Sequence, residues 1–152
     1  MLRIDIVAAG RLKKGPLHEL AQEYTKRIKG HLKIFEVESK HTNAKAIQAD
    51  EEKQFLSHMN EQAFVIVLDE RGDGLKSLDF AKTIQNFQNN GVNYFQFIIG
   101  GADGLTDTVR DRANLLLSFG QQTWPHMMAR IMLLEQIYRV QQILSGHPYH
   151  RE

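Results

Sequence analysis

The chain has 152 residues and no cysteine, with 42% hydrophobic and 24% charged residues and a formal net charge of +1. This length suits a single domain, residues 1–152, that can bury a core of its own. Without cysteine, disulfides, thiolate catalysis and cysteine-ligated metal centres are excluded. Because we find neither a membrane-length apolar run nor a signal-peptide pattern, we expect a soluble protein of the cytoplasm.

Hydrophobic periodicity predicts strands and helices that alternate along the chain. Alternating or continuous apolar runs predict strands over residues 2–8, 32–38, 63–68, 95–99 and 115–119. Apolar residues at helical spacing predict helices over residues 16–28, 44–59, 77–90, 106–113 and 126–144. Such alternation indicates an α/β fold, with a mostly parallel sheet flanked by helices.

Local residue types predict where several elements begin and end. Pro16 suits a first helical position, and Ser77 and Thr106 can each cap a helix N-terminus. The composition of residues 69–74 and of residues 120–125 predicts loops.

The fourth predicted strand ends in a glycine-rich loop, Gly100-Gly-Ala-Asp-Gly104. In open α/β sheets ligands bind beyond the carboxyl ends of the strands. We therefore expect a site made of three loops: Leu68–Glu70, Gly100–Gly104 and Phe119–Trp124. The glycine loop contains no lysine or arginine. Its ligand need not be strongly anionic, and S-adenosylmethionine, an adenosine cofactor without phosphates, would suit it.

Several other chemistries lack their motifs in this sequence. The P-loop pattern, the dinucleotide pattern Gly-x-Gly-x-x-Gly and the serine-hydrolase elbow are absent. His147 and His150 flank a proline and are poorly spaced for a shared metal, so we expect no metal site. Two alternatives stay open: an enzyme whose glycine loop binds a nucleotide phosphate, and a non-catalytic RNA-binding module.

Charge and apolar residues gather in two segments. Between Arg11 and Lys33 seven lysines and arginines face only two glutamates, which indicates either a solvated helix face or a surface for a polyanion. The first half of the last predicted helix has almost no polar face. That helix is therefore either a central core helix of a monomer or partly covered by a second copy in a homodimer.

The order of motifs in the second half of the chain resembles a known family. The motifs are Ile99–Leu105, Trp124-Pro-His126, Arg130, Glu135–Arg139 and the ending His147-Pro-Tyr-His-Arg-Glu152. Together they closely resemble the bacterial ribosomal RNA large subunit methyltransferase H family of the SPOUT superfamily. The resemblance covers the whole chain. One departure is Ala102-Asp103, where the family usually has Pro-Glu, and it bears on the exact shape of the loop.

The resemblance implies a fold, a reaction and partners. It implies a C-terminal trefoil knot and a homodimer that methylates N3 of a pseudouridine in 23S rRNA of the assembled 70S ribosome. The methyl donor would be S-adenosylmethionine, with no metal and no membrane involved. The family's cofactor contacts fall on Leu68, Gly100, Phe119, Gly120, Gln121, Gln122, Thr123 and Trp124. The basic segment would then contact RNA.

The chain end carries the residues that we expect to act on the target base: Tyr149, His150 and Arg151. An aromatic ring can stack on an extruded base, and an arginine can pair with its carbonyls or stabilise the N3 anion. A histidine can accept the N3 proton. The opposing interpretation is a frayed terminus. We expect His126 to cap or orient the cofactor loop rather than act as a base. Glu135 and Arg139 can pair on one helix face, either as a structural or dimer-interface ion pair or as groups that act on the RNA.

Overall fold

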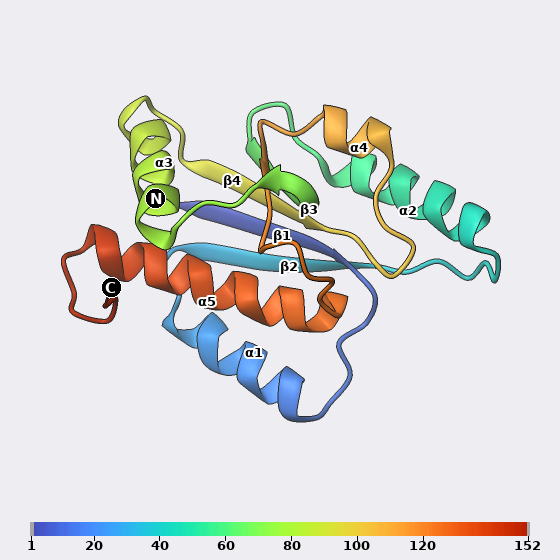
Figure 1. Cartoon of the computed structure of the whole chain (residues 1–152), viewed down its shortest axis with the longest axis horizontal. Coiled ribbons are helices and arrows are strands. Elements are labelled where there is room, and N and C mark those ends of the chain that lie inside the picture. The colour runs from blue at the N-terminus through green and yellow to red at the C-terminus, as the bar shows by residue number, and fades with distance from the viewer. Residues whose placement is uncertain (1, 152) are drawn as a thin grey trace.

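The computed structural model describes residues 2–151 and contains a sheet of five parallel strands covered by helices on both faces (Figure 1). The strands are β1 (Arg3–Ala9), β2 (His31–Val37), β3 (Phe64–Asp73), β4 (Tyr94–Ile99) and β5 (Leu115–Leu117). Their spatial order is β2-β1-β4-β3-β5. The predicted α/β fold with a mostly parallel sheet is confirmed, whereas the trefoil knot stays a prediction. Glu152, the last residue of the ending motif, lies outside the described residues.

Five helices complete the three layers of the fold. They are α1 (Pro16–Arg27), α2 (Ala44–His58), α3 (Ser77–Asn89), α4 (Asp107–Asp111) and α5 (His126–Leu144). Helices α1, α3 and α5 cover one face of the sheet, and α2 and α4 cover the other (Figure 1). None of the helices between residues 2 and 151 combines the length and the apolar character that crossing a membrane requires.

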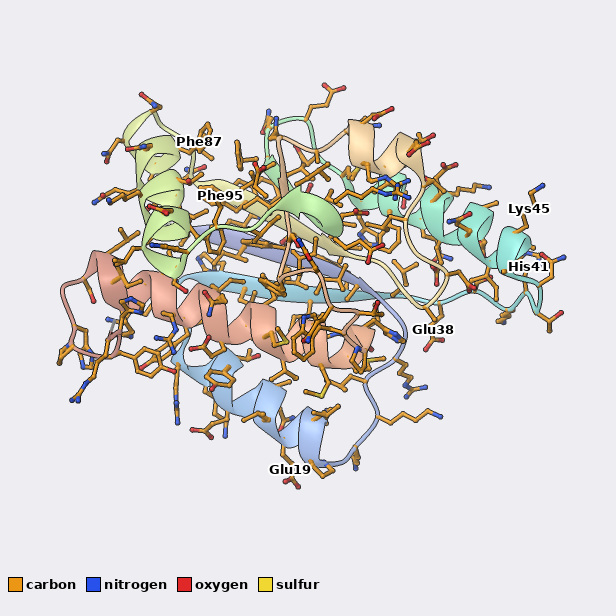
Figure 2. All side chains as sticks on the ribbon, viewed as in Figure 1. Glu19, Glu38, His41, Lys45, Phe87 and Phe95 are labelled. Atoms are coloured by element: carbon orange, nitrogen blue, oxygen red, sulfur yellow. The ribbon has the colours of Figure 1, made fainter. Side chains whose placement is uncertain are left out.

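The two helical layers pack on opposite faces of the same strands because side chains alternate along a strand. Within β1, Ile4 and Ile6 belong to the core under α1, α3 and α5, and Val7 belongs to the core under α2 and α4. Figure 2 labels Phe87 of α3 and Phe95 of β4 at one end of the first core; the ring of Phe64 packs between them, with centroids 4.0 and 5.8 Å away.

The structure corrects three local predictions. Residues 69–73 were predicted as loop, yet β3 continues to Asp73, which pairs with Leu117 of β5 after an irregularity. Gly72 permits this approach, since a Cβ there would lie 2.5 Å from the carbonyl carbon of Leu116. Strand β5 ends two residues earlier than predicted. Ser77 is not the cap of α3, because its hydroxyl donates instead to Gln136 of α5.

A buried polar cluster lies between β1 and β4 on the α2 face. The Tyr94 hydroxyl and the Gln96 side-chain amide both donate to Oδ2 of Asp5, which is 2% exposed. Burial, followed by the neighbouring carboxylate, raises the pKa of Tyr94 to about 12, so its hydroxyl stays a donor. The guanidinium of Arg3 covers the ring of Tyr94 at 4.1 Å from its centroid.

Tyr94→Phe tests how far this cluster stabilises the sheet. We expect the free energy of unfolding to fall by about 1–3 kcal/mol, because the buried carboxylate of Asp5 loses its phenolic donor. Denaturant unfolding measures the change. Tyr24→Phe, on the half-buried face of α1, is the matched control and should stay within about 0.5 kcal/mol of the unmodified chain. Equal losses in both variants would contradict this assignment.

Candidate functional site

Two loops, Gly100–Gly104 and Phe119–Trp124, converge with the second half of β3 on one cleft, beside the carboxyl ends of β4 and β5. The cleft has a volume of about 480 Å³. Seven of the eight expected cofactor residues line it: Leu68, Gly100, Phe119, Gly120, Gln122, Thr123 and Trp124. Gln121 is exposed and is not part of the lining. Additional walls come from α2, α4 and the start of α5, through Gln48, Arg110, His126 and Ala129.

The shape of the glycine loop depends on close packing around its glycines. A Cβ on Gly100 would lie 2.7 Å from Cγ of Leu105, so a larger residue would displace the end of the loop. Gly104 has a φ of +76°, a conformation that other residues rarely adopt, and its amide donates to the carbonyl of Gly101. Bare backbone is therefore exposed toward the cleft at this loop.

The loop from Phe119 to Trp124 is closed by its own side chains. The indole Nε1–H of Trp124 donates to the Phe119 carbonyl over 3.2 Å. At the base of the loop, the Ser118 hydroxyl donates to the Gly120 carbonyl and accepts from the Gly120 amide. The indole thus forms a wall of the cleft while remaining 40% exposed.

Arg110 of α4 is a site residue that sequence reasoning missed. Its guanidinium donates to the Leu105 carbonyl at 2.6 Å and to Asp69 Oδ2 at 3.2 Å. It therefore joins the end of the glycine loop to the strand β3 that lines the opposite wall. A third contact, to the exposed carboxylate of Asp107 at 2.6 Å, orients the guanidinium. This role depends on the contact of Arg110 with Asp69, which is distant in the sequence, so the sequence alone does not indicate it.

Arg130 is buried and contacts both the first loop of the chain and β2, while its Nε has no hydrogen-bond partner among the described residues. Its Nη2 donates to the Gly10 carbonyl at 2.9 Å, and its Nη1 pairs with Glu36 at 2.7 Å. Glu36 also accepts from the Leu12 amide at 2.7 Å. Burial raises the pKa of Glu36, but the hydrogen bonds from Arg130 and Leu12 outweigh it, so the pKa is lowered overall. Arg130 thus anchors α5 to the β1–α1 loop.

His126 lies at the start of α5 and lines the cleft, but it does not cap the helix. The N-cap position is Pro125, with no side-chain hydrogen bond. The imidazole packs against Gly10, where an added Cβ would lie 3.1 Å from its Nε2. Burial, followed by the charge of Arg130, lowers the pKa of His126, so the ring is neutral near neutral pH. The expectation that His126 helps to cap or orient the cofactor loop therefore stays a prediction, and the structure places this residue in the cleft wall.

The chain end folds back on the C-terminal half of α5 rather than fraying. The Tyr149 hydroxyl donates to Glu135 at 3.2 Å, and its ring packs edge-on against Tyr138. Arg139 pairs with Glu135 at 2.6 Å, as expected, and its Nη1 lies 3.1 Å from Nδ1 of His150. Figure 1 shows this red tail at the end of α5 opposite the glycine loop.

The three catalytic candidates, Tyr149, His150 and Arg151, do not line the cleft in their own chain. Tyr149 reaches Glu135, which lies about 13 Å along α5 from His126. Burial and then the charge of Glu135 raise the pKa of Tyr149 to about 12, so it is a donor rather than a base.

A second cleft of about 500 Å³ adjoins the first. It lies between α1, α3 and α5 and shares Phe119 and Gly120 with the first cleft. Glu135, which holds the tail, lines its other side. Within residues 2–151 no group of three or more metal-ligating side chains comes together.

Arg110→Ala tests the link between the cleft walls. In this variant the carboxylate of Asp69, whose side chain is 9% exposed, would lose its ion-pair partner. The carbonyl of Leu105 would lose its hydrogen-bond donor. We expect the free energy of unfolding to fall by about 1–3 kcal/mol and the glycine loop to be cut faster by protease. Arg112→Ala, an exposed neighbour, is the control. If both variants unfold at the same denaturant concentration, Arg110 does not join the walls.

Comparison with known proteins gives full-length matches. The family model described as "Predicted SPOUT methyltransferase" matches residues 2–150. A Ribosomal RNA large subunit methyltransferase H from Paramagnetospirillum magneticum is 44% identical over 151 residues, covering 99% of each chain. A relative of the same name from Rhodospirillum centenum is 45% identical over 154 residues, again with 99% of each chain covered.

Solved structures of low identity share the fold. A SpoU methyltransferase from Streptomyces viridochromogenes superposes with a TM-score of 0.51 at 14% identity, over 95% of this chain and 61% of the other. A protein from Legionella pneumophila, solved with the cofactor SAM bound, gives 0.51 at 15% identity, over 91% of this chain and 66% of the other. The family resemblance read from the motifs is confirmed: the chain belongs to the SPOUT methyltransferases and, within them, to the ribosomal RNA large subunit methyltransferase H family.

Proposed function

We propose that this chain is an S-adenosylmethionine-dependent rRNA methyltransferase, acting as one domain over residues 1–152. The observation that carries the proposal is the meeting of two loops and the second half of β3 at one cleft, in a chain 44% identical to a relative named as an rRNA methyltransferase. In finer detail, we propose that it methylates N3 of a pseudouridine in 23S rRNA within assembled ribosomes of the cytoplasm.

The residues of the cleft fit the cofactor. Its volume of about 480 Å³ lies in the range of small-molecule sites. Side chains of both charge signs, including Asp69 and Arg71, line it together with apolar Leu68 and Phe119, which suits a zwitterion attached to an adenosine. When bound, the cofactor would supply a methyl group on a positively charged sulfur that is its own leaving group.

The target base requires groups that bind it and manage its N3 proton. We retain Tyr149, His150 and Arg151 for this role. Nε2 of His150 is buried without a hydrogen-bond partner among the described residues, which leaves a ring nitrogen for a further contact. The second cleft supports this assignment, since its lining includes both Glu135, which accepts from the Tyr149 hydroxyl, and the Phe119–Gly120 wall that it shares with the cofactor cleft.

The RNA and a second subunit would occupy further surfaces. All seven lysines and arginines between Arg11 and Lys33 are exposed, which supports contact with phosphates, although Arg27 is paired with Glu23. We also propose a homodimer. Its supporting observation is that three large apolar side chains near the two clefts are 40–43% exposed: Leu20, Trp124 and Met128.

Methyl transfer from labelled S-adenosylmethionine tests the proposed function. We expect label in unmethylated 70S ribosomes and none in free 23S rRNA, because the target surface would form only on assembly. A ribosome already methylated at the target is the control. Label in free RNA as well would remove the requirement for assembly, and no label in any sample would contradict the proposed activity.

Removal of residues 149–152 tests the role of the tail. We expect methyl transfer to fall by at least about a hundredfold, while affinity for S-adenosylmethionine changes less than about threefold, because the tail lies outside the cofactor cleft. Titration calorimetry measures the affinity and the labelled assay measures turnover. Since Tyr149 packs on α5, Tyr149→Phe, which keeps the ring, controls for loss of packing. Unchanged turnover in the truncated chain would rule out a catalytic tail.

A further inference from the structure

A buried carboxyl group lies directly behind the glycine loop. Glu51 of α2 is 8% exposed, and its Oε1 has no hydrogen-bond partner among the described residues. Its two oxygens face Gly101, where an added Cβ would lie 3.5 Å from Oε2 and 3.6 Å from Oε1. The same Cβ would lie 3.1 Å from Cβ of Ala9. Gly101 is therefore pressed between the end of β1 and this carboxyl group.

The surroundings of Glu51 contain no compensating charge. Its pKa is raised by burial, next by the carboxylate of Asp103 in the loop and then by Asp50 on its own helix. Ala9 of β1, which lies against Gly101, is uncharged. Glu51 forms no ion pair within residues 2–151. A buried carboxylate without a partner is costly, so this packing favours the neutral acid.

Helix α2 also holds the loop by a second contact. Gln48, one turn before Glu51, lines the cofactor cleft and donates from its side-chain amide to the Asp103 carbonyl at 3.1 Å. By contrast, no hydrogen bond within residues 2–151 is donated by the backbone amides of Gly101, Ala102 and Asp103. The loop is thus fixed by its packing on α2 more than by hydrogen bonds of its own.

We propose that Glu51 is a positioning residue, whose neutral carboxyl group supports the glycine loop in the shape that binds the cofactor. Ionisation would place a second negative charge beside Asp103, and the loop would have to open to hydrate it. The binding-competent fraction would then fall, and the apparent affinity with it. Glu51 does not touch the cofactor cleft itself. This inference rests on the proposed function for the identity of the ligand, S-adenosylmethionine.

The sign of the pH dependence follows from the raised pKa. Support from a group that must be neutral is complete at low pH and is lost as the pH rises through its pKa. We therefore expect the affinity of the unmodified chain for S-adenosylmethionine to fall by at least about threefold as the pH rises from 4.5, the ordinary pKa of a glutamate, to 8.5. Glu51→Gln, which is neutral and of the same shape, should bind with an affinity independent of pH over this range.

Two further variants separate the positioning effect of Glu51 from a general effect of pH on the protein. Glu51→Ala removes the support and should bind more weakly at every pH, with Glu51→Gln restoring the affinity. Glu52→Gln, the adjacent and half-exposed residue of α2, should keep the pH profile of the unmodified chain. Titration calorimetry measures the affinities. The inference is overturned if Glu51→Gln keeps the pH dependence of the unmodified chain, or if Glu51→Ala binds as tightly as Glu51→Gln.

Hydrogen exchange without any cofactor tests the same inference independently of the proposed function. We expect amides of residues 100–104 to exchange at similar rates in the unmodified chain and in Glu51→Gln near pH 4.5, and faster in the unmodified chain near pH 8.5. Comparison at equal pH cancels the intrinsic rate. If no variant binds S-adenosylmethionine, the proposed function fails, while equal exchange at both pH values would overturn the role of Glu51.

Discussion

The buried guanidinium of Arg130 is the interaction on which the arrangement of the site depends. It reaches from α5 to the carbonyl of Gly10 after β1 and to Glu36 of β2, and it is only 2% exposed. The Phe119–Trp124 loop leads directly into α5, so fixing the start of this helix also fixes the end of that loop. One buried cation therefore joins the start of α5 to β1 and β2, which come from the opposite end of the chain.

Local periodicity was sufficient to predict most of the fold. The bounds of α5 agree with the prediction from His126 to Leu144, because a proline precedes the helix and Ser145-Gly146 ends it. The position of the cleft could also be predicted, since parallel strands bring their carboxyl ends to one edge of the sheet, although Leu68–Glu70 belongs to β3 and is not a loop. Thr106 caps α4 through the Val109 amide, as its residue type indicated.

The features that escaped prediction depend on partners far apart in the chain. The hydroxyl of Ser77 donates to Gln136, 59 positions later, and therefore does not cap α3. Strand β3 extends past Leu68 because Gly72 leaves room for the backbone of Leu116. Arg110 looks in sequence like any charged residue of a short helix. The same holds for Glu51, whose burial follows from how α2 packs on the glycine loop and not from its neighbours in the chain.

The indole that closes the Phe119–Trp124 loop has a practical consequence. Trp124 is the single tryptophan of the chain, and it lines the cofactor cleft while remaining 40% exposed. Its fluorescence, when excited at wavelengths that the four tyrosines absorb little, therefore originates from one defined place. Emission and quenching of this one ring report directly on the opening, closing and occupancy of the cleft, so the protein carries its own spectroscopic label.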